Sequence, residues 1–420
     1  MVQGDKKQRN MERMAERVPE ANEQSLQHFV SESQWDEREV LDLIALEADK
    51  HLGGEEDSCL LVDESGLAKK GKKSVGVSRQ WCGNKGKVDN CQVGVYLALC
   101  KGDRATLIDG RLYLPEVWVK DEARCLEAGI PKEEIVFKTK HESALEMVCH
   151  AKRLGVRYNW VGCDGFYGED PGFVRMLDEQ GDIFLADVHK DQHVYLEDPN
   201  PVVPERKSNR GRAPKCLQAQ SLPLRVDEFV AHQPKHAWQP TKLRDGAKGE
   251  LRADILHRRV WLWDREEAQA HCWHLVVRRE NNSPETIKYS LSNAPAETPL
   301  SRLAFMQTQR FWIEQSLRDG KQEAGLGDYQ LRKWRGWQHH MALTMMVMLF
   351  MLEERLLNRD ETPLLSCSDV RKLLGQFLPK RDVTTEEVIR QMEVRHRKRQ
   401  AGINNSYKKQ DNQSLNSCSG

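Results

Sequence analysis

The stretch Cys59-Leu60-Leu61-Val62-Asp63 places a carboxylate directly after four apolar residues, and Trp160-Val161-Gly162-Cys163-Asp164 repeats the pattern later in the chain. A short apolar run of this kind is typical of a buried strand, so we expect each aspartate at a strand end. A third acid, Glu314, lies in a stretch with helical spacing. Carboxylates that two strands and a helix bring together can form an open site for hard divalent cations.

Length and composition indicate an ordinary globular protein. The chain has 420 residues, 39% of them hydrophobic and 30% charged, enough for about two or three domains. Its longest apolar stretch, 341–352, is too short to cross a bilayer and predicts a buried helix. Because no apolar segment follows the early charges, we expect a reducing, cytoplasmic location and no membrane contact. The 11 cysteines form no CxxC pair and are expected to be free thiols.

The net charge of zero conceals a strong separation of charges along the chain. Residues 30–57 hold ten acidic and two basic residues, whereas 65–87 hold seven basic residues and no acid. A single charged block is more typical of a solvated face than of a binding site. Several basic blocks around a carboxylate site favour a polyanionic partner, because phosphate neutralisation supplies most non-specific affinity for nucleic acid. The basic residues that we expect at DNA here are Lys69, Lys70, Lys72, Lys73, Arg210 and Arg212.

The order of the expected elements indicates the fold class. Hydrophobic periodicity predicts strands at 59–62, 92–100, 105–114, 158–163 and 183–188, with helices at 121–128, 142–154 and 171–180. This βββαβαβ order is that of the ribonuclease-H-like fold, in which the first and fourth strands are neighbours. Asp63 and Asp164 would then face each other.

The remaining segments complete an α/β architecture in which a ribonuclease-H-like core is interrupted by a β-rich insertion. Alternating patterns bounded by Pro, Gly and Asn predict the strands of the insertion, and a helix is expected at 301–323. The last residues are rich in Asn, Ser, Gln and Lys, which predicts a disordered tail. The predicted units are a helical N-terminal region (1–57), the first part of the core (58–189), the insertion (190–299), the catalytic helix with core completion (300–356), and basic helices with the tail (357–420).

Arg310, Glu314 and Lys321 share one face of the predicted helix and have the spacing Arg-x3-Glu-x6-Lys. With the two strand-end aspartates, this segment resembles the DDE-class bacterial insertion-sequence transposases that carry a Tyr-x2-Arg-x3-Glu-x6-Lys signature and a β insertion before the final acid. The likeness covers most of residues 10–355. Gln307 stands at the tyrosine position of the signature.

The resemblance implies a function and roles for these residues. Asp63, Asp164 and Glu314 would be catalytic and would hold two Mg²⁺ ions, with Mn²⁺ as a possible substitute. Arg310 and Lys321 would contact DNA phosphate near the cleaved bond. The reaction would be cleavage at element ends followed by strand transfer. The implied partners are double-stranded DNA, as terminal repeats and target, and a second copy of the chain in a synaptic complex at the bacterial nucleoid.

Three tryptophans of the insertion, Trp261, Trp263 and Trp273, are candidates for stacking on an unpaired base, although packing in the insertion's own core is the commoner role for such residues. Glu64 is expected on the opposite strand face from Asp63. Two other functions fit the same residues. One is a structure-selective nuclease of this fold without strand transfer, and the other is a DNA-binding derivative that has lost catalysis.

Overall fold

A ten-stranded sheet forms the centre of the molecule in the computed structural model, which describes residues 2, 10–205, 214–246, 249–280 and 283–417. Its strands are β1 (Ser58–Ala68), β2 (Ser78–Cys82), β3 (Lys87–Lys101), β4 (Arg104–Leu112), β5 (Trp160–Cys163), β6 (Phe184–Val188), β9 (Gln239–Gly246), β10 (Gly249–Leu262), β11 (His271–Glu280) and β12 (Ser283–Ser292). The spatial order is β2-β3-β1-β5-β6-β12-β11-β10-β9, and β4 pairs with β3. A separate two-stranded sheet joins β7 (His193–Val194) and β8 (Leu224–Arg225).

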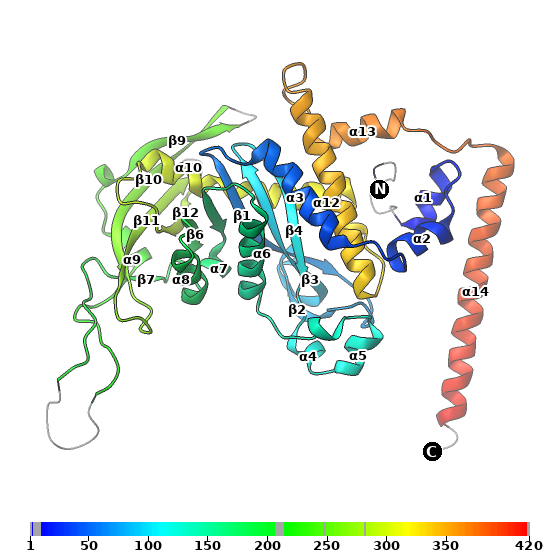
Figure 1. The fold of residues 1–420 in the computed structure, drawn as a ribbon, viewed down its shortest axis with the longest axis horizontal. Helices are drawn as coiled ribbons and strands as arrows, with labels where there is room; N and C mark the ends of the chain where they lie inside the picture. Colours follow the sequence, from blue (N-terminus) through cyan, green and yellow to red (C-terminus); the bar gives the residue numbers. More distant parts are fainter. Residues whose placement is uncertain (1, 3–9, 206–213, 247–248, 281–282, 418–420) are drawn as a thin grey trace.

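The helices cover this sheet and extend beyond it (Figure 1). They are α1 (Met11–Arg17), α2 (Glu23–Ser31), α3 (Glu37–Leu52), α4 (Glu116–Val119), α5 (Glu122–Glu127), α6 (Lys140–Leu154), α7 (Gly165–Gly168), α8 (Pro171–Glu179), α9 (Val226–Ala231), α10 (Leu300–Gln309), α11 (Phe311–Asp319), α12 (Trp334–Leu357), α13 (Cys367–Phe377) and α14 (Thr385–Ser417). Helices α3 and α12 pack on β4, and α6 packs on β3. Capping fixes their starts: Asp36 caps α3, and Thr139 and Glu142 form a capping box at α6.

The strand β1 brings the two predicted aspartates together. It pairs in parallel with β5, and Val62 lies opposite Cys163, so that Asp63 and Asp164 come next on neighbouring strands. This confirms the expected adjacency of the first and fourth predicted strands. The predicted strand end was wrong, because β1 continues past Asp63 to Ala68. The continuation is stabilised by β3, which pairs with β1 along its whole length.

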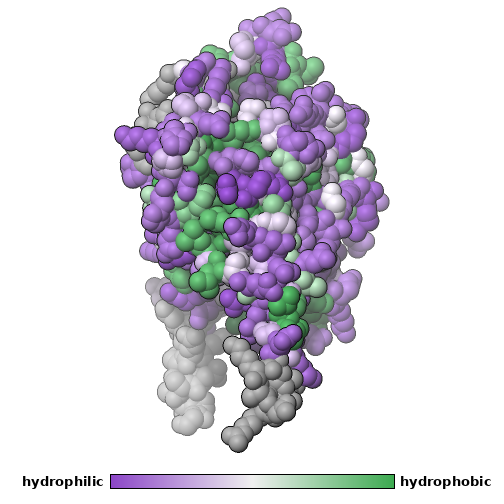
Figure 2. All heavy atoms as spheres, turned by 90° about the vertical axis from the view of Figure 1, so that its left-hand side faces the viewer, coloured by the Kyte–Doolittle hydropathy of each residue, from purple (hydrophilic) through white to green (hydrophobic). Residues whose placement is uncertain are grey.

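The predicted β-rich segment is present, and its strands continue the main sheet. The strand β12 pairs antiparallel with β6, placing Leu291 opposite Ala186, and β11, β10 and β9 follow in turn. A second apolar cluster, which includes Phe229, Val260 and Leu275, packs beside these strands. Figure 2 looks at this end of the molecule and shows hydrophobic residues near the middle of the face, between hydrophilic borders.

The predicted helix at 301–323 is interrupted. Arg310 ends α10 and precedes α11, and residues 320–324 form a π-helical turn that carries Lys321. The spacing of Arg310, Glu314 and Lys321 therefore does not describe one regular helix. Helix α11 nevertheless packs against β1, β3 and β4, so Glu314 is delivered to the sheet.

The C-terminal segment differs from the expected disordered tail. Residues Thr385–Ser417 form α14, which runs beside the body of the molecule (Figure 1). Ion pairs from Arg395 to Glu16 (2.8 Å) and from Lys398 to Glu12 (3.3 Å) connect α14 to α1. Within the described part of the chain, no helix has the length and apolar character that a membrane span requires.

Gly168 provides a test of how α7 is packed on β6. A Cβ atom at Gly168 would lie 2.0 Å from the backbone oxygen of Asp187, so Gly168→Ala must shift backbone. We expect the free energy of unfolding to fall by about 1–3 kcal/mol in urea titrations followed by tryptophan fluorescence. The control is Gly375→Ala in α13, where the new methyl group meets nothing within 4 Å and should raise stability by roughly 0.5–1 kcal/mol. Equal stability of Gly168→Ala and wild type would contradict this packing.

Candidate active site

The three predicted acids line one cleft of about 670 Å³ together with Arg310 and Lys321. Asp63 comes from β1, Asp164 follows β5, and Glu314 lies in the first turns of α11. Residues far apart in sequence are thus gathered at the edge of the sheet where β5 and β6 end. The sequence analysis predicted this grouping.

Asp63 is half-buried and lies beside another acid. Its Oδ1 accepts a hydrogen bond of 2.7 Å from the backbone N–H of Glu64. Burial and the neighbouring charge of Asp164 raise the pKa of Asp63 to about 7, against the opposing effect of Arg310. Without a counter-charge, the ionised pair is therefore unfavourable.

Asp164 is fixed by the helix that follows it. It is the N-cap of α7, and its Oδ1 accepts hydrogen bonds from the backbone N–H groups of Phe166 (3.1 Å) and Tyr167 (3.4 Å). Burial raises the pKa of Asp164, Arg310 opposes that change, and Glu64 adds to it. The cap orients a carboxylate that local electrostatics disfavour, so the position suits a cation.

Arg310 is the positive charge at the centre of these acids. Its Nη1 lies 2.7 Å from Oε1 of Glu314, and its Nε lies 3.0 Å from Oδ2 of Asp187. Burial alone would lower the pKa of Arg310, but Asp187, Glu314, Asp63 and Asp164 outweigh it and raise the pKa. The guanidinium thus offsets part of the acidic charge, and it holds Glu314 by an ion pair.

The acids of the cleft are of a chemical type that fits a divalent cation. All three predicted ligands offer carboxylate oxygens, the donor type that Mg²⁺ and Mn²⁺ prefer. Among the described residues, two groups hold three possible ligand atoms within 4.8 Å of one another: Glu47, His51 and Glu353, and Glu169, His189 and Asp191. Asp63, Asp164 and Glu314 are not among these groups of described residues, and Glu314 is paired with Arg310.

The predicted basic residues fall into different environments. Lys321 is half-buried in the cleft, where burial lowers its pKa while Asp63 opposes that change. Lys69 packs over the ring of Tyr329 and donates to its backbone oxygen at 2.6 Å, which makes it a structural residue. The side chains of Lys70, Lys72 and Lys73 are exposed in the loop after β1. Arg210 and Arg212 lie outside the described residues.

The three tryptophans are a correction to the sequence prediction. Trp273 is 7% exposed and packs edge-on against Phe184, with ring centroids 5.0 Å apart, so it belongs to the core. Trp263 is half-buried and its indole N–H donates to the backbone of Glu267 at 2.8 Å. The strand registers place Trp261, also half-buried, level with the N-terminal end of β6, whereas the cleft lies at the C-terminal end. None of the three lines the cleft.

Two cleft-side residues, Asp187 and Trp81, were missed by sequence reasoning. Asp187 lies near the end of β6 and binds Arg310, and an acid late in a predicted strand was the available signal. Trp81 on the unpredicted strand β2 lines the cleft and is 55% exposed. Its position inside the basic segment 65–87 could have identified it, because aromatic residues among basic ones are typical of nucleic-acid surfaces.

Glu64 also differs from expectation. It lines the same cleft as Asp63, instead of facing away from it. Its carboxylate is held by Lys140 Nζ at 2.7 Å and accepts from the hydroxyl of Tyr167 at 3.2 Å. These contacts make Glu64 a support for the site, since both of its oxygens have protein partners.

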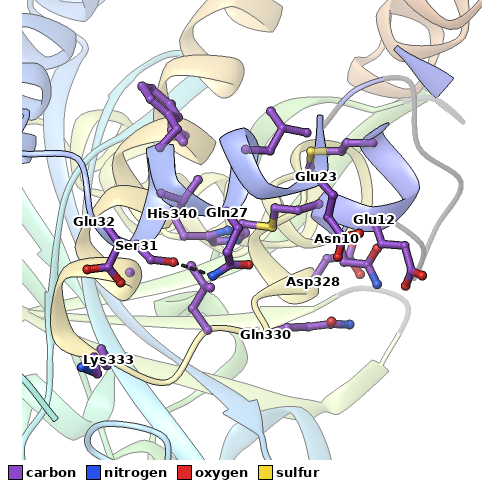
Figure 3. Close-up of a pocket in the computed structure, with 18 of the residues that line it drawn as sticks. Asn10, Glu12, Glu23, Gln27, Ser31, Glu32, Asp328, Gln330, Lys333 and His340 are labelled. Carbon is purple, nitrogen blue, oxygen red and sulfur yellow. Dashed lines mark hydrogen bonds between the residues drawn. The ribbon is translucent and has the colours of Figure 1, made fainter. Parts of the chain in front are cut away.

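A second cavity, of about 690 Å³, lies apart from the acids, between α1, α2 and α12 (Figure 3). Its lining combines apolar residues such as Leu26 and Met346 with polar ones such as Gln27, whose side chain donates to Ser31 at 2.5 Å. His340 borders it, and its Nε2 is hydrogen-bonded to the backbone oxygen of Gly325 at 2.9 Å. Four acids, Glu12, Glu23, Glu32 and Asp328, also line this cavity, and none of the three predicted catalytic acids does.

The sequence model of a family described as DDE superfamily endonuclease matches residues 1–250, which include Asp63 and Asp164. The chain belongs to this endonuclease family. Two acids of the cleft in this DDE endonuclease, Asp63 and Asp164, lie within the matched residues, and Glu314 lies beyond them. DDE enzymes depend on divalent metal ions, and the carboxylate donors of the cleft agree with that requirement.

The endonuclease is also similar to individual proteins. It is 26% identical over 330 residues to a probable transposase for insertion sequence element IS701 from Microchaete diplosiphon, covering 78% of this chain and 73% of the relative. A solved structure, the NurA nuclease from Sulfolobus solfataricus, aligns over 77% of this chain and 93% of its own with 8% identity and a TM-score of 0.25. That TM-score is too low to support any assignment.

The raised pKa of Asp63 predicts a pH dependence of stability. Between about pH 4 and 7 the folded protein keeps a proton that the unfolded chain has lost, so stability falls as pH rises. Asp63→Asn removes this effect. In the presence of a chelator, the free energy of unfolding of Asp63→Asn minus that of wild type should increase by about 1–3 kcal/mol between pH 4 and pH 7. If urea titrations gave parallel pH profiles of stability for the variant and wild type, the raised pKa of Asp63 would be contradicted. Added Mg²⁺ at pH 7 should reduce the stability difference between Asp63→Asn and wild type.

Proposed function

We propose that this DDE endonuclease is a DNA transposase that cleaves element ends and transfers the freed strand into target DNA. The observation that carries the proposal is the placement of Asp63, Asp164 and Glu314 around one cleft, with the first two on neighbouring parallel strands. The similarity to a transposase along most of both chains supports the strand-transfer step. The catalytic core is of the ribonuclease-H-like type, and β9–β12 are its insertion.

The chemistry needs two divalent cations, Mg²⁺ in the cell and Mn²⁺ as a substitute, held by Asp63, Asp164 and Glu314. Bound cations activate a water or a 3′-hydroxyl and stabilise the leaving oxygen. Asp63 and Asp164, which come directly after paired residues of the parallel strands β1 and β5, would hold the ions together with Glu314. Glu314 joins the site by leaving Arg310, whose guanidinium then becomes available to a DNA phosphate.

Cationic side chains supply the remaining electrostatic stabilisation. Arg310 and Lys321 line the cleft beside the acids and bind phosphate oxygens near the cleaved bond. The exposed residues Lys70, Lys72 and Lys73 bind DNA farther from the reacting phosphate. The indole of Trp81 offers a stacking surface within the cleft, in place of the insertion tryptophans.

The wider assignments complete the proposal. The units 1–57, 58–189, 190–299, 300–356 and 357–420 are the domains of the enzyme. Two copies act in the synaptic complex, because two element ends must be joined. The enzyme works in the bacterial cytoplasm at the nucleoid.

Loss of the acids tests the catalytic assignment. Asp63→Ala, Asp164→Ala and Glu314→Ala should each reduce Mg²⁺- or Mn²⁺-dependent nicking of supercoiled plasmid by more than about 100-fold. Glu116→Ala is the control, because the Glu116 side chain is exposed on α4, and this variant should nick as wild type does.

Joining of a pre-cut element end to target DNA separates the proposed transposase from a nuclease of the same fold. Nicking without joining would favour the nuclease. Binding of DNA without metal-dependent nicking by the wild type would favour an inactive DNA-binding derivative.

The loop after β1 allows a test of DNA affinity. Replacing Lys70, Lys72 and Lys73 together by Ala should weaken binding to every duplex sequence alike. The slope of log K against log salt should fall by about 2 to 3, as expected for the loss of three phosphate contacts. Lys120→Ala, an exposed lysine on the end of α4, should leave the slope unchanged. An unchanged slope in the triple variant would place DNA elsewhere.

A further inference from the structure

We infer that Asp187 is a positioning residue for Arg310 and that Ser290 and Gln307 hold Asp187 in place, so that the strand β12 orients the cationic group of the active site. The inference rests on the proposed function, in which Arg310 binds DNA phosphate. It concerns residues outside the three acids, and it gives the β-rich segment a direct connection to catalysis.

The orientation of the Arg310 side chain depends on its side-chain partners, because no regular helix continues through this residue. It lies at the junction between α10 and α11, where the helix is interrupted. Its two ion pairs reach in different directions, through Nη1 to Glu314 at 2.7 Å and through Nε to Asp187 at 3.0 Å. When Glu314 turns toward a cation, the pair with Asp187 is the contact that keeps the guanidinium at the cleft.

Asp187 is itself held from the neighbouring strand. Ser290 of β12 lies directly opposite it in the ladder, and the Ser290 hydroxyl donates to Oδ1 of Asp187 at 2.6 Å. Each oxygen of Asp187 therefore has its own donor, Ser290 on Oδ1 and Arg310 on Oδ2. The carboxylate cannot rotate without losing both bonds.

Gln307 completes the hydrogen-bond network that runs from Ser290 through Asp187 to Arg310. Its side-chain nitrogen donates to Ser290 Oγ at 2.8 Å and to the backbone oxygen of Val276 at 3.3 Å. Since Ser290 Oγ accepts from Gln307, its own proton is directed to Asp187. Gln307 is the residue that departs from the tyrosine of the resembled signature. In this chain the Gln307 side chain links α10 to β11 and β12. A glutamine can make both contacts because its amide nitrogen carries two N–H groups.

Burial protects this hydrogen-bond network from replacement by water. Ser290 is fully buried and Gln307 is 4% exposed, so water does not replace a lost partner. Ser292 is equally buried two residues along β12, and its hydroxyl donates to the backbone of Phe184 at 2.5 Å without touching Asp187. Ser292 therefore provides a matched control for the loss of a buried serine hydroxyl.

The test combines variants of full-length protein with plasmid nicking in Mn²⁺. Asp187→Asn and Ser290→Ala should slow nicking about 10- to 100-fold, as expected for residues that orient an active-site group. Ser292→Ala should change the rate less than about twofold when thermal unfolding shows comparable stability loss in the two serine variants. In an Arg310→Ala background, Asp187→Asn should have almost no further effect, because the group that it positions is absent.

Two results would overturn the inference. One is an equal loss of nicking in Ser292→Ala and Ser290→Ala, and the other is a full effect of Asp187→Asn in the Arg310→Ala background. If the wild type nicks no plasmid, the proposed function fails instead. The same double-mutant cycle, measured on affinity for a short blunt duplex in Ca²⁺, then decides whether Asp187 acts through Arg310.

Discussion

The parallel pairing of β1 with β5 is the constraint on which the rest of the site depends. It places Asp63 and Asp164 side by side in a half-buried position, where burial and the charge of Asp164 disfavour the ionised form of Asp63. A protein keeps such a pair only if positive charge is available. Arg310 supplies part of that charge, and the divalent cations of a DDE endonuclease supply the remainder when they bind.

This electrostatic demand explains the arrangement around the acids. Asp164 is capped by the backbone of α7, and Glu64 is held by Lys140 and Tyr167, so the carboxylates are oriented before any cation arrives. Glu314 is held by its ion pair with Arg310. The acids are therefore oriented from the strands and α7 on one side and by Arg310 on the other.

The sheet also explains why the β-rich segment matters to a cleft that its tryptophans do not reach. The strand β12 pairs with β6 and so lies directly beside the strand that carries Asp187. A fully buried serine on β12 then reaches the guanidinium of Arg310 through one carboxylate. Elements that are separate along the chain are mechanically one unit, because ladder hydrogen bonds and buried polar contacts join them.

The sequence by itself indicated β1, β3, β4, β5 and β6, the three candidate acids and the Arg310–Glu314–Lys321 spacing, because burial patterns and short-range spacing are local properties of a chain. It did not determine that β12 joins β6, that α10 and α11 break at Arg310, or that Asp187 and Trp81 flank the cleft. It also predicted stacking roles for tryptophans that the structure places away from the cleft, with Trp273 buried in the core. Only the tertiary structure decided these points, since strand partners and registers depend on contacts between residues far apart in the chain.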